Sequence, residues 1–182
     1  MLTNLAYRKI ETLANELIAK SEISEPPVPV DRIVEGYNIT IREFDFEEGI
    51  SGVLVITEDG ATIGVNPGDT KTRMRFALAH ELGHFLLHKE TNEVFIDKDF
   101  IVKWRNVESN GNYTVEEVNQ EMEANAFAAA LLMPKNLIER EMAKKEMVEM
   151  GENALLIELA NRFDVSLPAI AFRITNINSY YV

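Results

Sequence analysis

The segment from Thr70 to His88 constrains the fold of this 182-residue chain more than any other. Its pattern predicts a long helix, and apolar side chains lie nearly all round that helix. Because a helix that is apolar on every side must be buried, other elements have to cover more than one of its faces. A chain of this length can supply them within one domain. The apolar positions are Met74, Phe76, Leu78, Leu82, Phe85 and Leu86.

All three histidines of the chain lie on this helix, at His80, His84 and His88. Residues four apart on a helix differ by one turn and about 40°, so the first two imidazoles point into the same space and can bind one metal ion. Glu81 lies about 100° from His80, where it can reach a water molecule without being a ligand, and is the candidate general base. A lone histidine on an apolar helix is usually structural, but this spacing favours a metal centre. Because the chain has no cysteine, the ligands must be histidine and carboxylate.

Two histidines leave such a site one protein ligand short, because catalytic zinc usually takes three and keeps one position open. A second long helix is predicted from Thr114, which has capping-box spacing to Glu117, to about Met133. Its candidate ligands are Glu116, Glu117, Glu121 and Glu123.

Helix geometry favours Glu123 as the third ligand. This residue shares its face with Phe127 and several alanines, whereas Glu121 points roughly 160° away. The small residues would let the two helices approach closely, and Gly83 would permit the same approach from the other side. The alternative is that Glu123 is an ordinary solvated glutamate.

Short strands are predicted before the histidine helix, at residues 39–46, 52–57 and 61–66, with a hairpin turn at 58–60. We expect the end of the third strand to be a sheet edge that binds an extended substrate by strand addition. Residues 89–113 have no sustained period and predict a loop. The strand residues proposed to bind substrate are Ile63, Gly64, Val65 and Asn66, and further helices are predicted at 4–20, 136–149, 153–163 and 167–175.

His88 and Tyr113 are secondary candidates. His88 lies over two turns from His80, too far to share one coordination sphere, and we expect it to be a cation at the helix C-terminus. A hydrogen bond to a ligand, or contact with the substrate, is the alternative. Either residue could stabilise an oxyanion, although a structural role is commoner for both.

Two blocks of this sequence resemble the ImmA/IrrE family of metallo-endopeptidases. The first is Phe76 to His88 and the second is Glu123 to Pro134. The segments 27–31 and 63–66 are also similar to the usual lead-in of that family. The resemblance covers about residues 1–135 and supports Glu123 as the third ligand.

The resemblance implies a zincin-like α+β fold: a small twisted antiparallel or mixed sheet of about three strands, packed on an active-site helix and a second, ligand-bearing helix. Residues 1–135 would form the metallopeptidase domain, and residues 136–182 a helical extension packed on it. The implied cofactor is Zn²⁺, with Mn²⁺ or another divalent ion as the alternative. The implied activity is cleavage of a helix-turn-helix repressor of a phage, mobile element or stress response, which derepresses its genes.

Charge and hydropathy bear on the competing functions. The formal net charge of −12 disfavours direct contact with nucleic acid, and no apolar run approaches the ~18 residues of a membrane span. Without a visible signal peptide, we expect a cytoplasmic protein. One alternative is a DNA-binding regulator that uses the C-terminal helices, where only Arg162 and Arg173 supply positive charge. Another is a regulator that binds a repressor without cleaving it, and the presence of Glu81 argues against that one.

Overall fold

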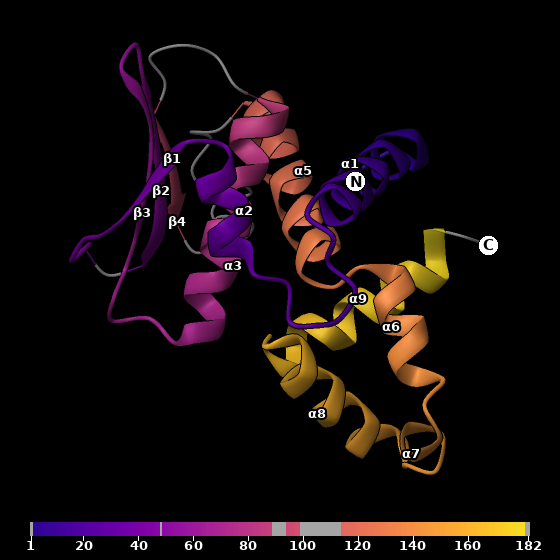
Figure 1. Cartoon of the computed structure of the whole chain (residues 1–182). Coiled ribbons are helices and arrows are strands. Elements are labelled where there is room, and N and C mark those ends of the chain that lie inside the picture. Colours follow the sequence, from indigo (N-terminus) through magenta and orange to yellow (C-terminus); the bar gives the residue numbers. More distant parts are fainter. Residues whose placement is uncertain (1, 48, 89–93, 99–113, 181–182) are drawn as a thin grey trace.

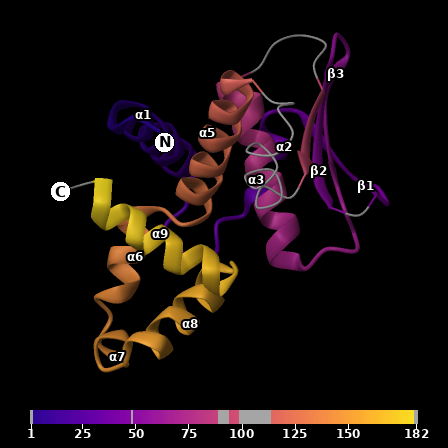
Figure 2. The same ribbon diagram turned by 180° about the vertical axis from the view of Figure 1, so that it is seen from behind.

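The computed structural model describes residues 2–47, 49–88, 94–98 and 114–180. Its helices and strands form layers (Figures 1 and 2): a sheet packs on α3, α5 lies on the other side of α3, and α1 packs on α5. The elements are α1 (Asn4–Lys20), α2 (Val30–Gly36), β1 (Ile39–Glu43), β2 (Ile50–Thr57), β3 (Gly60–Val65), α3 (Lys71–Leu87), β4 (Val94–Lys98), α5 (Val115–Leu132), α6 (Lys135–Met142), α7 (Lys145–Val148), α8 (Glu152–Phe163) and α9 (Leu167–Tyr180).

The sheet is mixed, with the strand order β1-β3-β2-β4. β2 and β3 form the predicted hairpin, in which Thr57 pairs with Gly60, and β1 runs parallel to β3. The α+β prediction is confirmed, with one addition: β4 lies in the segment predicted as a loop and pairs with β2.

The prediction that residues 63–66 lie at a sheet edge is wrong. β3 has β1 on one side and β2 on the other, so its backbone groups are already paired. Ile63 and Val65 are buried in the core, and Gly64 lies beneath Phe44 and Phe46, whose ring atoms would be 2.9 Å from an added Cβ. Strand periodicity identifies a strand but not its neighbours, which is why the sequence did not reveal this position.

α3 has the environment that its apolar pattern predicts. Thr70 caps its N-terminus by accepting a hydrogen bond from the backbone N–H of Arg73, and every residue from Ala77 to Phe85 is buried. The sheet covers one side of the helix and α5 covers another (Figure 1). The histidine segment is therefore enclosed between two layers rather than exposed on a surface helix.

The C-terminal helices are joined to the rest of the protein by a buried ion pair. Arg173 of α9 is 1% exposed, and its guanidinium donates to the carboxylate of Glu11, to the Tyr7 hydroxyl at 2.7 Å and to the Met133 carbonyl at 3.0 Å. The guanidinium thereby connects α9 to α1 and to the end of α5. Removing one partner of a buried pair costs about 3–5 kcal/mol, so this contact fixes where α9 lies.

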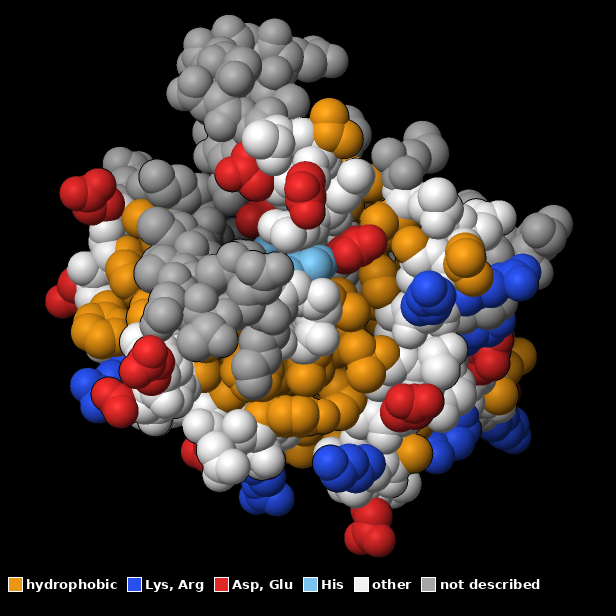
Figure 3. Space-filling model, turned by 90° about the horizontal axis from the view of Figure 1, so that it is seen from above, with side chains coloured by type: hydrophobic (Ala, Val, Ile, Leu, Met, Phe, Trp, Pro, Cys, Tyr) orange, Lys and Arg blue, Asp and Glu red, His pale blue; other side chains and the backbone are white. Residues whose placement is uncertain are grey.

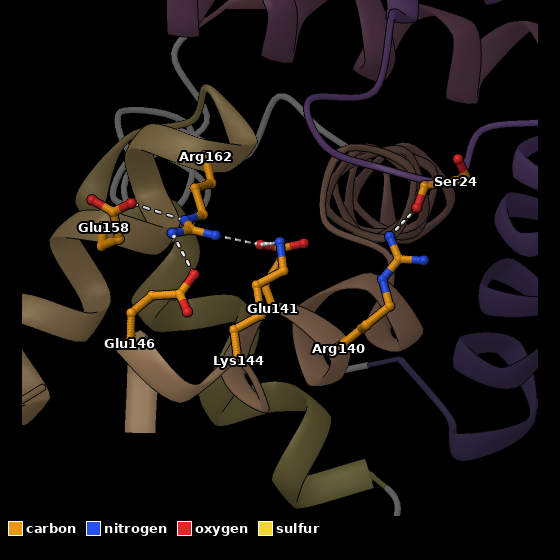
Figure 4. Close-up of polar contacts among 7 residues, drawn as sticks. All are labelled: Ser24, Arg140, Glu141, Lys144, Glu146, Glu158 and Arg162. Carbon is orange, nitrogen blue, oxygen red and sulfur yellow. Dashed lines mark hydrogen bonds and ion pairs between the residues drawn. The ribbon is translucent and has the colours of Figure 1, made fainter. Parts of the chain in front are cut away.

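A second charged cluster joins α6, α7 and α8 (Figure 4). Arg162 donates to Glu158 and Glu141, each at 2.8 Å, and lies 3.4 Å from Glu146, while Lys144 donates to Glu141 at 2.6 Å. Arg162 and Arg173, the two cations on which a DNA-binding role would depend, are therefore both paired with carboxylates of the protein itself.

Glu141 gives this cluster a predictable pH dependence. Burial alone would raise the pKa of its carboxyl, but the hydrogen bonds and charges of Lys144 and Arg162 outweigh burial and lower the pKa. A lowered pKa stabilises the fold above the ordinary glutamate value of about 4.3, and this stabilisation is lost as the pH falls through the folded-state pKa.

We expect Glu141→Gln to lower the free energy of unfolding at pH 7 by about 1–3 kcal/mol, the usual cost of an unsatisfied buried group. Urea titrations of both proteins should show that the difference narrows as the pH falls below about 4. Glu158→Gln changes a more exposed partner of the same arginine and should have little effect. A Glu141→Gln difference that stays constant from pH 7 to pH 3 would contradict the explanation.

Candidate metal centre

His80 and His84 bring two ring nitrogens together on one face of α3. Their Nε2 atoms are 3.0 Å apart, and the side chains are 1% and 2% exposed. The spacing of four residues predicts this convergence, because one helical turn separates the two side chains. Two buried imidazoles with converging nitrogens form half of a tetrahedral ligand set.

The third group of this cluster is the carboxylate of Glu121, from α5. Its Oε2 lies 3.7 Å from Nε2 of His80, and its Oε1 lies 3.6 Å from Nε2 of His84. These three residues form the one cluster of potential metal ligands in the described ranges. Glu123 lies elsewhere: its Oε2 is 2.9 Å from Nε2 of His88. The structure therefore corrects the prediction that Glu123 joins the two histidines.

The packing of α5 explains the correction. This helix is covered by α3 on one side and by α1 on another, so its apolar residues do not all point toward α3. α5 approaches Gly83 of α3 through Phe127 and through Ala124: an added Cβ on Gly83 would lie 3.0 Å from the Phe127 ring and 3.2 Å from the Ala124 Cα. Glu121 precedes Ala124 by three residues and lies on the same side of α5. The close helix approach predicted for Gly83 is confirmed.

The donor set fits a divalent metal. Two imidazoles and one carboxylate are common ligands of catalytic zinc, which leaves the fourth position open. Zn–N bonds of 2.0–2.1 Å place neighbouring ligands of a tetrahedral ion roughly 3.3 Å apart, and the three donors lie 3.0 to 3.7 Å apart. Mn²⁺ also accepts histidine and carboxylate ligands, so the donors do not select between the two ions.

Glu81 follows His80 on α3, and its carboxylate lies toward β2 of the sheet. It is fully buried, and an added Cβ on Gly52 of β2 would be only 3.0 Å from its Oε1. Since real Cβ atoms rarely come so close, the missing side chain at position 52 makes room for the carboxylate. The sequence reasoning missed Gly52, although a glycine inside a strand is a signal of close approach by another group.

The structure places the remaining candidate residues, His88 and Asn66, in different environments. His88 is the C-cap residue of α3, and its ring nitrogens lie near His84 and Glu123. Tyr113 lies outside the described residues. Asn66, the last of the proposed substrate-binding residues, donates from its side chain to the Ile50 carbonyl at 3.2 Å and from its backbone to the Ser51 carbonyl. Its polar groups therefore close the end of the hairpin.

All three histidines lie on α3 or at its C-cap, and histidine atoms reach the surface on one face of the molecule. Viewed from above, histidine atoms are visible in a recess of the molecule with acidic side chains beside them (Figure 3). The clustered carboxylates suit a cation, because opposite charges attract most strongly where water is partly excluded. None of the described helices combines the length and apolar character that a membrane span requires.

Two known proteins are similar to this chain, one in sequence and one in fold. The chain is 27% identical over 164 residues to an uncharacterized immunity region protein of Bacillus phage phi105, a match that covers 88% of this chain and 92% of the phage protein. Its fold is similar to that of a Mycobacterium tuberculosis transcriptional regulator, with a TM-score of 0.61 and 14% identity. That match covers 92% of this chain but only 46% of the regulator.

A family model describes a still more specific relationship. The model of the IrrE N-terminal-like domain, Peptidase_M78, matches residues 34–175, a range that includes the histidine helix, α5 and most of the C-terminal helices. Since this match covers well over half of the sequence, the chain belongs to the Peptidase_M78 family of IrrE N-terminal-like domains.

Proposed function

We propose that this protein is a metal-dependent endopeptidase that cleaves a helix-turn-helix repressor. One observation carries the proposal: Glu81, which is fully buried, directly follows His80, and His80 converges with His84 and Glu121. A structural site would need only the donors. A glutamate next to them that is not part of the cluster is what hydrolysis requires in addition.

The side chains divide the chemistry between them. A bound divalent cation would polarise the scissile carbonyl and make water a stronger nucleophile near neutral pH. Glu81 accepts the proton of the attacking water on its carboxylate and then transfers that proton to the leaving amine. Gly52 leaves the space that this carboxylate occupies between α3 and β2.

The topology supports β4 as the strand that binds the substrate. β4 pairs with β2, whose Gly52 contacts Glu81, and in the described part of the chain β4 has a neighbouring strand on one side only. An extended peptide that added to the other side would gain backbone hydrogen bonds. This assignment replaces β3, whose two sides are both paired.

The choice of a repressor as substrate rests on the resemblance to ImmA/IrrE proteins and on charge. The similar phage protein is described as an immunity region protein. The net charge of −12 favours a partner with a basic face, and the DNA-binding surface of a repressor is basic. Cleavage between its DNA-binding and dimerising parts would abolish operator binding.

The test is a cleavage assay with the repressor encoded next to the gene for this protein. The chain loaded with one equivalent of Zn²⁺, or separately of Mn²⁺, should convert the repressor into two discrete fragments, and mass spectrometry should identify one new pair of termini. Glu81→Gln protein should give no fragments. An intact repressor that nevertheless leaves its operator would overturn cleavage in favour of sequestration. Equal cleavage of unrelated unfolded proteins would overturn the specific role.

A further inference from the structure

A short chain of hydrogen bonds leads away from the metal centre. Nδ1 of His84 lies 3.2 Å from Nδ1 of His88, and Nε2 of His88 lies 2.9 Å from the Glu123 Oε2. The side chain of His88 is 6% exposed, so the middle of the chain is largely shielded from water. The three residues join α3 to α5 at the end where the proposed ligands lie.

With Glu123 ionised and both histidines neutral, these hydrogen bonds have one consistent direction. An ionised carboxylate only accepts, so Glu123 requires the proton on Nε2 of His88. A neutral imidazole that donates from one nitrogen accepts at the other, so Nδ1 of His88 accepts from Nδ1–H of His84. His84 then has no proton on Nε2, the nitrogen that lies 3.0 Å from the corresponding atom of His80.

We infer that His88 and Glu123 are positioning residues that hold His84 as a metal ligand, an inference that rests on the metal centre of the proposed function. They fix its proton on Nδ1 and orient its ring, so that a lone pair on Nε2 points toward His80 and Glu121. Such partners of ligating histidines typically contribute 10–100-fold to metal affinity. Glu123 thus serves the site that it was predicted to join, but through two hydrogen bonds rather than by ligation.

The proton position can be measured in the metal-free protein. Nitrogen-15 NMR of the histidine rings should show the His84 proton on Nδ1 in the wild type. In His88→Phe, which keeps a ring of similar size but cannot accept a hydrogen bond, that preference should be lost. A wild-type spectrum with the proton on Nε2 of His84 would overturn the inference, because that nitrogen would then be blocked.

Metal affinity provides the second readout, measured by competition for Zn²⁺ with a chromophoric chelator. We expect Kd to rise about 10–100-fold in His88→Phe and in Glu123→Ala. Glu123→Gln should lie between wild type and Glu123→Ala, because an amide oxygen can still accept from His88. Glu116→Gln removes the same charge from an exposed position in the first turn of α5 and should leave Kd unchanged.

The outcomes separate this inference from the proposed function. Unchanged affinity and an unchanged His84 proton position in folded Glu123→Ala protein would overturn the positioning role alone, and would leave the metal centre in place. A wild-type protein that binds no Zn²⁺ would overturn both. If His88→Phe fails to fold, the Glu123 variants, whose side chain is partly exposed, provide the same two measurements and still test the inference.

Discussion

Glu81→Gln should lower the kcat of peptide cleavage by about 10²-fold or more while the protein keeps its metal. Glutamine has nearly the same shape, so it fills the space beside Gly52, but its amide cannot accept the proton of the attacking water. The rate of repressor cleavage is measured at a saturating repressor concentration. Bound Zn²⁺ is measured by elemental analysis of the same enzyme sample.

His80→Ala is the matched control for this prediction. It removes a proposed ligand from the residue next to the base, so it should abolish both metal binding and cleavage. The two variants together separate the base from the ligands. If Glu81→Gln lost its metal as completely as His80→Ala, Glu81 would be a ligand, and its assignment as the general base would be wrong.

The second large effect is expected from two glutamates that lie two residues apart on α5. Glu121→Gln should weaken Zn²⁺ binding by more than the 10–100-fold typical of a partner that only supports a ligand, because it removes a charged donor atom. Glu123→Gln makes the same chemical change on another side of the helix and should have the smaller effect. Chelator competition at pH 7 measures both dissociation constants.

The order of the two effects is the decisive result. A greater loss of affinity in Glu123→Gln would show that the carboxylate two residues later is the ligand. It would also contradict the positioning role of His88, because Glu123 would then have to turn from His88 toward the metal. Thermal unfolding of the metal-free variants checks that neither substitution separates α5 from α3.

Local patterns were sufficient to predict most of the fold. Thr114 and Glu117 form the capping box that their spacing indicates, with hydrogen bonds of 2.6 and 3.2 Å, and α5 follows directly. The histidine helix begins directly after Thr70, close to the start that its pattern predicts, and is buried as its composition requires. These features depend on residues close together in the chain, where side-chain chemistry and helical geometry act directly.

What could not be predicted depends on partners distant in sequence. The third carboxylate was misassigned because α5 is apolar toward both α1 and α3, so its composition does not reveal which side faces the histidines. The edge strand was misassigned because β1 and β4 pair with the hairpin from opposite sides. Neither pairing changes the alternation of apolar and polar residues along β3, so the sequence does not reveal it. The short helix α2 was missed because its seven residues are too few for a clear period.

The contact between Gly52 and Glu81 has a consequence for how this site could lose its activity. Position 52 contributes no functional group, yet the Cβ of any side chain there would lie 3.0 Å from the Glu81 Oε1. A single added methyl group on the strand could thus displace the base and leave every metal donor in place. In the proposed mechanism, one added carbon atom on β2 would therefore separate a protein that cleaves its substrate from one that only binds metal.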